Sequence, residues 1–169
     1  MKFKILSVFF ITLLFSACQA GWTEENVAEI ENQTSTIVSI QFFEEGQIVD
    51  SVQIQPTEKL LYAREVFAGT GKLSPPDVTK EYFSGHKYGV WPRRSDSLVV
   101  IFNHRYRVTH YYDSILPANT PTKFYGYNHE RNIPNQKNFE MVVKKASKQT
   151  VSYLFTYTFT EDDYRFAKE

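Results

Sequence analysis

The chain has 169 residues with 19 basic and 19 acidic side chains, so its formal net charge is zero. This balance disfavours nucleic-acid binding, because domains that bind phosphate backbones carry a marked basic excess. Aromatic residues make up 16% of the chain and there is one cysteine, so packing must build the core and no disulfide can form within the chain.

The first 17 residues have the three-part layout of a secretory signal peptide. Two lysines open the segment, an apolar run covers residues 5–15, and small residues precede Cys18. The run is about 11 residues long, whereas a membrane-spanning helix needs about 20. We therefore expect residues 1–17 to be a removable leader.

The end of the leader, Leu14-Phe15-Ser16-Ala17-Cys18, resembles the bacterial lipobox, with Phe15 where that motif usually has Leu. The resemblance implies that Cys18 is diacylated on sulfur and becomes the mature N-terminus. Two acyl chains anchor a protein stably to a membrane, whereas one gives only marginal binding. The alternative is an ordinary signal peptide with an incidental cysteine. We expect residues 18–26 to form a polar tether and residues 27–169 to form one domain.

The rest of the chain predicts a succession of short strands separated by turn residues. The expected strands cover residues 37–42, 48–54, 59–63, 96–102, 105–112, 139–145 and 150–159. The first two form a hairpin around a Gly-containing loop. Residues 96–102 are the most apolar segment after the leader and predict a central strand buried on both faces, which turns at Asn103 and His104. Residues 139–145 fit a helical turn or a strand, and the polar turn that follows favours the strand.

The last predicted strand has the clearest alternation, with an apolar face and a mostly hydroxylated face. The apolar face consists of Val151, Tyr153, Phe155, Tyr157 and Phe159. Thr160 then has the character of a helix N-cap, and the three acidic residues after it suit the positive end of a helix dipole. The sequence therefore predicts a short C-terminal helix.

Short strands, few helical signals and frequent turns are typical of an all-β fold. We expect a single β-sandwich, immunoglobulin-like or related, with the C-terminal helical turn. A small β-barrel is the alternative, and it would enclose a ligand cavity.

Several segments together make the chain similar to small Bacteroidota lipoproteins of unknown function. They are the leader, residues 96–102, Arg131-Asn132-Ile133 and residues 157–164. The resemblance implies a place at the outer membrane but no activity. Surface lipoproteins of these bacteria have acidic residues directly after the lipidated cysteine, whereas Gln19-Ala20 follows Cys18 here. We therefore expect the domain to face the periplasm, with surface exposure as the alternative.

The same bacteria O-glycosylate sequences that resemble Asp, then Ser or Thr, then an aliphatic residue. Three segments fit: Asp50-Ser51-Val52, Asp96-Ser97-Leu98 and Asp113-Ser114-Ile115. Ser97 enters a strand that we expect to be buried. Ser51 and Ser114 are therefore the candidate glycosylation sites.

Two loop-like regions rich in Gly and Pro carry aromatic and arginine side chains, the residue types that dominate interface energies. The candidate ligand-binding or partner-binding residues are Tyr82, Phe83, Tyr88, Trp91, Arg93, Phe124, Tyr125 and Tyr127. Such rings also stack on sugars. The alternative is that they fold back and cover the edge of the sandwich.

No pattern of catalytic or metal-binding residues stands out. There is no Gly-x-Ser-x-Gly elbow, and Ser84 and His86 are too close in sequence to form a nucleophile–base pair readily. His104 and His110 are six residues apart and could face the same side of one strand, although a polar face in contact with solvent accounts for both residues. We expect no cofactor, no metal and no catalysis. The chain is interpreted as a lipoprotein that binds a protein partner of the envelope, with glycan or small-ligand binding as the alternative.

Overall fold

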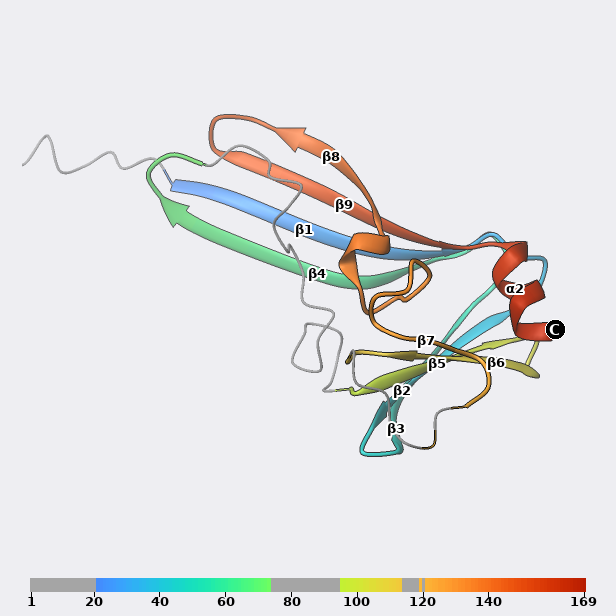
Figure 1. Ribbon diagram of the computed structural model, residues 1–169. Coiled ribbons are helices and arrows are strands. Elements are labelled where there is room, and N and C mark those ends of the chain that lie inside the picture. The colour runs from blue at the N-terminus through green and yellow to red at the C-terminus, as the bar shows by residue number, and fades with distance from the viewer. Residues whose placement is uncertain (1–20, 74–94, 114–118, 120) are drawn as a thin grey trace, which may run out of the picture.

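The structure, a computed structural model, describes residues 21–73, 95–113, 119 and 121–169 (Figure 1). The leader and the lipidation site Cys18 lie outside these residues. So do five of the candidate binding residues, Tyr82, Phe83, Tyr88, Trp91 and Arg93, and the candidate glycosylation site Ser114.

The fold consists of two β-sheets and confirms the all-β, sandwich-like prediction. Sheet A has the order β4-β1-β9-β8 and sheet B the order β3-β2-β5-β6-β7, and neither closes into a barrel in the described part. Sheet A is formed by β1 (Gly21–Asn32), β4 (Lys59–Thr70), β8 (Glu140–Ala146) and β9 (Thr150–Phe159). Sheet B is formed by β2 (Val38–Glu44), β3 (Gln47–Ile54), β5 (Ser97–Phe102), β6 (Tyr106–Tyr111) and β7 (Phe124–Tyr125).

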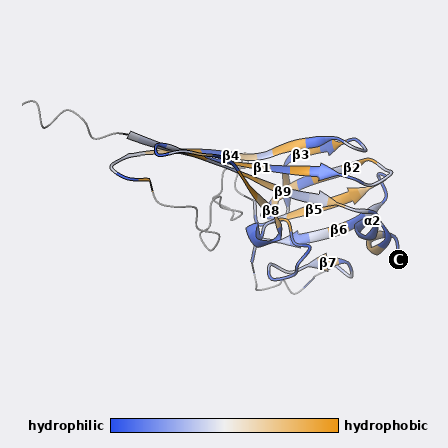
Figure 2. Ribbon diagram, turned by 90° about the horizontal axis from the view of Figure 1, so that it is seen from above, coloured by the Kyte–Doolittle hydropathy of each residue, from blue (hydrophilic) through white to orange (hydrophobic). Residues whose placement is uncertain are grey.

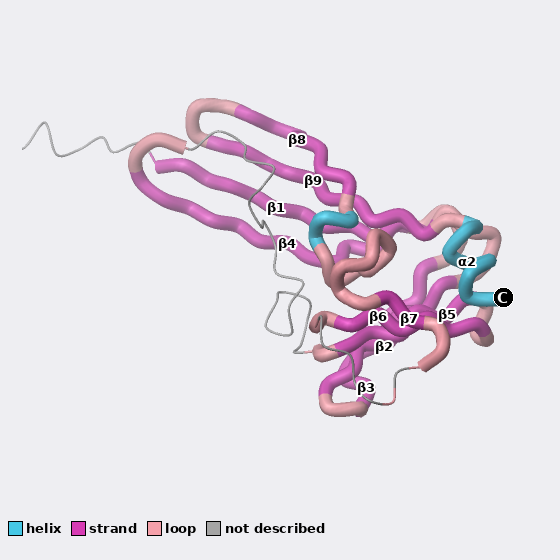
Figure 3. The backbone as a smooth tube through the Cα atoms, viewed as in Figure 1, coloured by secondary structure: helices cyan, strands magenta, loops and turns pink. Residues whose placement is uncertain are grey.

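Within the described residues there are two short helices, η1 (Gln136–Asn138) and α2 (Glu161–Lys168). The predicted C-terminal helix is confirmed as α2. Thr160 and Asp163 form a reciprocal capping box at its start, which satisfies backbone donors that the first turn leaves free. Figure 3 shows α2 beside one end of sheet A, near the β5–β6 hairpin of sheet B.

Sheet A extends well beyond sheet B at the end away from α2 (Figure 1). We call this projection the arm. It comprises residues 21–26 of β1, 65–70 of β4, 143–146 of β8 and 150–153 of β9, which the strand registers place side by side. The arm is the least sandwich-like part of the molecule.

The first strand begins at Gly21, earlier than the domain start expected near Val27. Residues 21–26, expected in the tether, pair with both β4 and β9. This part of the strand was not predicted from the sequence, because the polar residues Glu24 and Asn26 occupy inward positions beside the apolar residues of β9. They are buried and joined by a hydrogen bond of 3.2 Å from Asn26 Nδ2 to Glu24 Oε1. Polar residues at inward positions therefore concealed a buried strand.

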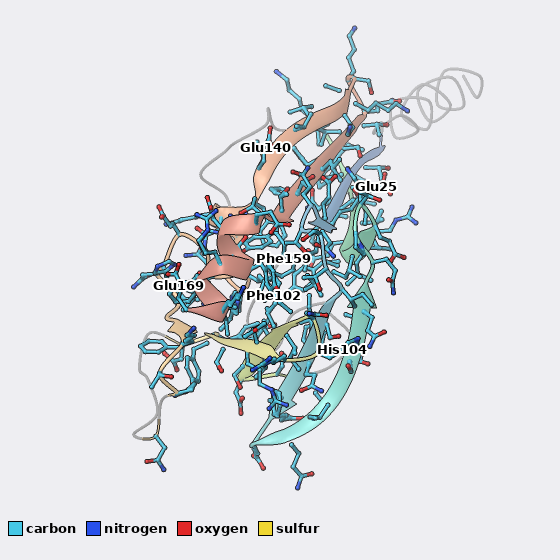
Figure 4. All side chains as sticks on the ribbon, turned by 90° about the vertical axis from the view of Figure 1, so that its right-hand side faces the viewer. Glu25, Phe102, His104, Glu140, Phe159 and Glu169 are labelled. Carbon is cyan, nitrogen blue, oxygen red and sulfur yellow. The ribbon has the colours of Figure 1, made fainter. Side chains whose placement is uncertain are left out.

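The inner face of β9 forms the centre of the core. Its five alternating residues from Val151 to Phe159, as predicted, are all almost completely buried. Phe159 packs edge to face against Phe102 of sheet B, with ring centroids 5.6 Å apart (Figure 4). Figure 2 shows the alternation of hydrophobic and hydrophilic residues along the strands. The aromatic contacts join the two sheets.

The two predicted hairpins of sheet B are confirmed. Glu45 and Gly46 connect β2 to β3, and residues 103–105 connect β5 to β6. Glu45, Gly46, Asn103 and His104 have positive φ. Two positive-φ residues give the turn whose twist matches paired strands. β5 is central, as expected, but Val99 is half-buried, so burial on both faces is incomplete.

Other boundaries also differ from the sequence prediction. β4 continues to Thr70 instead of ending near residue 63, and β7 was not predicted. Residues 140–146 form a strand, which confirms the favoured interpretation. Ser51 is exposed on β3 and accessible for glycosylation, which stays a prediction.

Replacing Phe155 with Ala should lower the free energy of unfolding by about 3–5 kcal/mol, because the change leaves a cavity between the sheets. Thr156→Ala, which alters the neighbouring residue on the opposite face of β9, should cost less than about 1 kcal/mol. Urea denaturation followed by circular dichroism measures both values. Equal losses would contradict the assignment of β9's inner face.

Candidate functional site

Arg131 fastens the segment after β7 to sheet A and α2. Its Nε donates to Asp163 Oδ1 at 2.7 Å, its Nη2 contacts Asp163 Oδ2, and Nη2 also donates to the Thr158 carbonyl at 2.7 Å. The guanidinium carbon lies 4.8 Å from the ring centroid of Tyr157. A bidentate, charge-assisted pair of this kind holds its partners in a fixed geometry.

Hydrogen bonds of Asn132 and His110 connect the same segment to sheet B. Asn132 Nδ2 donates to the carbonyls of Tyr111 and Tyr125, at 3.1 and 2.9 Å. The backbone N–H of Ile133 donates to His110 Nδ1 at 3.1 Å. Burial, and then the nearby charges of Arg131 and His129, lower the pKa of His110 to about 3. His110 is therefore a neutral acceptor inside the core.

Tyr125, one of the candidate binding residues, is a packing residue. Its ring stacks between His129 and Phe166, with centroid distances of 4.3 and 5.0 Å and interplanar angles of 21° and 17°. Burial raises the pKa of Tyr125 to about 12. Both faces of this ring are covered, which is the alternative role considered for the loop aromatic residues.

The other two described candidates are also partly covered. Phe124 is half-buried and packs edge-on against Tyr111, with centroids 6.3 Å apart, and Tyr127 is half-buried. In the described part of the second loop, the aromatic side chains therefore pack mainly against the rest of the fold beside sheet B. The candidates between residues 82 and 93 lie outside the described residues and stay predictions.

The described residues do not assemble catalytic or metal-binding chemistry. No group of three or more His, Cys, Asp or Glu side chains within them could hold a metal ion. His110 is buried, whereas His104 is exposed in the β5–β6 turn, so the two are not one polar face. Nor does any helix in the described ranges have the length and apolarity to cross a membrane.

Exposed apolar side chains concentrate on the two outermost strands of sheet A. They are Leu61, Val66 and Phe67 on β4 and Val142 and Val143 on β8. Within the described sheets, each of these strands has a neighbour on one side only. An outermost strand presents backbone donors and acceptors that another extended chain can pair with.

The two edges differ in their protection. β8 carries a register shift between Val143 and Lys145, and both Lys144 and Lys145 are exposed. Bulges and lysines are the devices that discourage pairing at an edge. The irregularity in β4 lies opposite Ala28 and Glu29, so residues 63–70 pair with β1 without interruption. The distal half of β4 is thus the better docking edge.

Sequence reasoning missed this edge because it ended the strand near residue 63. The alternation continues beyond that point, since Arg64 and Val66 face outward and Glu65 and Phe67 face inward. The signal was present but was obscured by the mixture of charged and apolar residues.

No family model, curated protein or solved structure matched the chain.

Arg131→Ala should lower the free energy of unfolding by about 3 kcal/mol, because it leaves the buried carboxylate of Asp163 without its cation. Arg165→Ala is the matched control. Arg165 pairs with Asp162 on the exposed surface of α2, and its loss should cost between 0 and about 1 kcal/mol. Urea denaturation distinguishes the two, and a similar small loss in both variants would refute the fastening role of Arg131.

The depressed pKa of His110 predicts acid sensitivity. Between pH 6.5 and about 3 the unfolded chain binds a proton at this position that the folded chain does not bind. This contribution to stability is complete above pH 6.5 and is lost as the pH falls. Denaturation of wild type and His110→Asn should differ in slope by about 1.4 kcal/mol per pH unit near pH 5. A wild-type slope in His110→Asn would contradict the prediction.

Proposed function

We propose that this chain is a lipid-anchored, non-enzymatic binding module of the cell envelope that captures a protein partner at the distal edge of β4. The observation that carries the proposal is an uninterrupted edge segment, residues 63–70, with Val66 59% exposed and Phe67 46% exposed. An extended segment of a partner would add a strand here, with backbone hydrogen bonds for affinity and side-chain contacts for specificity.

The arrangement of side chains on β4 suits such a strand. Val66 lies on the outer face of sheet A opposite Glu25, whereas Phe67 lies on the inner face opposite Glu24. Arg64 is tied to Glu25 by an ion pair of 2.7 Å. A partner strand added to β4 would therefore contact an apolar residue on each face of the sheet. The Arg64–Glu25 ion pair beside them would fix the register of the partner strand.

The sequence around Cys18 supports the proposed lipid anchor. Cys18 directly follows a predicted leader with a basic start, an apolar run and small residues, and β1 begins three residues later, at Gly21. An anchor at this point would attach the membrane directly to the arm. We place the module at the outer membrane, facing the periplasm.

Glycan binding has less support from the described loops. A sugar ring stacks on a free aromatic face, but His129 and Phe166 cover both faces of Tyr125. The proposal therefore favours a protein partner.

Capture from native membranes with tagged wild type and Val66→Lys tests the docking edge. A lysine at the edge should reduce recovery of the partner about tenfold, the effect of losing roughly 1.4 kcal/mol of binding energy. Ile48→Lys is the matched control, because Ile48 is 54% exposed on β3 of the other sheet. Thermal unfolding checks that both variants fold. Identical partners and recoveries for Val66→Lys and wild type would overturn the docking edge.

A further inference from the structure

We propose that the end of the arm binds an anionic phospholipid surface and stands the domain on the membrane. This inference rests on the proposed lipid anchoring and adds a second, electrostatic contact. The end of the arm is defined by the start of β1, the end of β4 and the β8–β9 turn. The hydrogen bond from Thr23 N to Gln149 O, 2.8 Å, joins the first and the last of these.

Four exposed lysines gather at this end of the molecule. They are Lys72 after β4, Lys144 and Lys145 at the end of β8, and Lys148 in the β8–β9 turn. None of the four forms an ion pair with another residue of the described part of the chain. A chain with no net charge overall thus concentrates positive charge at one end.

The carboxylates of the arm, Glu24 and Glu25 of β1 and Glu65 of β4, all have partners. Glu24 is buried and accepts a hydrogen bond from Asn26. Glu25 accepts from Arg64 Nε at 3.0 Å and from the Ser152 hydroxyl at 3.4 Å. Both acidic side chains of β1 at this level are engaged within the sheet, so the lysines face solvent with their charge available.

An aromatic side chain lies at the same end. Trp22 is half-buried, and its indole packs over Gly69, its partner across the β1–β4 pair. A Cβ atom at Gly69 would lie 2.5 Å from the indole atom Cζ2, so the glycine makes room for the ring. Tryptophan beside lysine is the combination found where proteins meet the headgroup region of a membrane.

The sequence places the anchor at the same end as these side chains. Cys18 precedes Gly21 by three residues, which span at most about 10 Å when extended. That reach is about one Debye length at 0.1 M salt. Acyl chains on Cys18 would therefore bring the lysines within electrostatic range of the headgroups, with α2 at the far end of the molecule (Figure 1).

Vesicle binding by the chain from residue 18 with Cys18→Ser tests the contact without acylation. Circular dichroism checks that this chain folds. We expect binding to vesicles that contain phosphatidylglycerol, weak binding to phosphatidylcholine alone, and release at high salt. With Trp91→Phe added, the emission of Trp22 should shift to the blue on anionic vesicles.

A triple variant, Lys144→Ala with Lys145→Ala and Lys148→Ala, should weaken binding to anionic vesicles about a hundredfold, or roughly fivefold per lysine. The matched control removes three positive charges elsewhere, by Arg107→Ala, Lys137→Ala and Lys168→Ala, and should stay within about threefold of wild type. Circular dichroism checks the fold of both variants.

Three outcomes would overturn the proposal: wild type that does not prefer anionic vesicles, binding that does not fall with salt, or equal losses in both triple variants. The first two outcomes are measured on the wild type, so the proposal can be refuted even if a variant does not fold. The assay contains neither acyl chain nor partner. Its failure would leave the proposed anchor and docking edge standing, whereas failure of partner capture would leave the vesicle result unchanged.

Discussion

The inner face of β9 is the constraint on which the rest of the structure depends. Its aromatic residues fill the space between the sheets, and Phe159 meets Phe102 of sheet B. Tyr157 extends the same row toward the loop, where its hydroxyl donates to the Arg131 carbonyl at 2.8 Å and its ring lies under the guanidinium. Without this face, the sheets would lose their common core and Arg131 would lose the surface that orients it.

The two ends of the molecule differ in how their polar and apolar side chains are covered. Around Arg131, charges and amides are paired and largely withdrawn from solvent, and a buried network of that kind specifies one arrangement of its segments. Lys123 adds to it by donating to the Phe166 and Ala167 carbonyls at the end of α2, at 3.1 and 2.8 Å. The arm instead exposes apolar side chains and lysines. The two ends of the molecule thus differ in how much apolar and charged surface they present to solvent.

Period-2 alternation and turn chemistry were enough to predict most of sheet B, β9 and α2. They failed for β1, because Glu24 and Asn26 occupy inward positions that the alternation rule assigns to apolar residues. The role of Tyr125 was equally inaccessible, since its neighbours His129 and Phe166 come from segments whose meeting depends on the tertiary fold. Sequence patterns report local periodicity, and the docking edge and the cluster of lysines arise from strand order and register.

The parallel pairing of β1 with β9 has a consequence for how the chain acquires its structure. Thr23 pairs with Thr150 and Asn32 with Phe159, so the first strand cannot complete its contacts until nearly the whole polypeptide is present. Such a high contact order slows folding, because a long loop must close before the pairing is rewarded. During synthesis from the N-terminus, β1 would therefore lack its partner β9 until the end of the chain has been made. Sheet A could then assemble only after the C-terminal segment had followed.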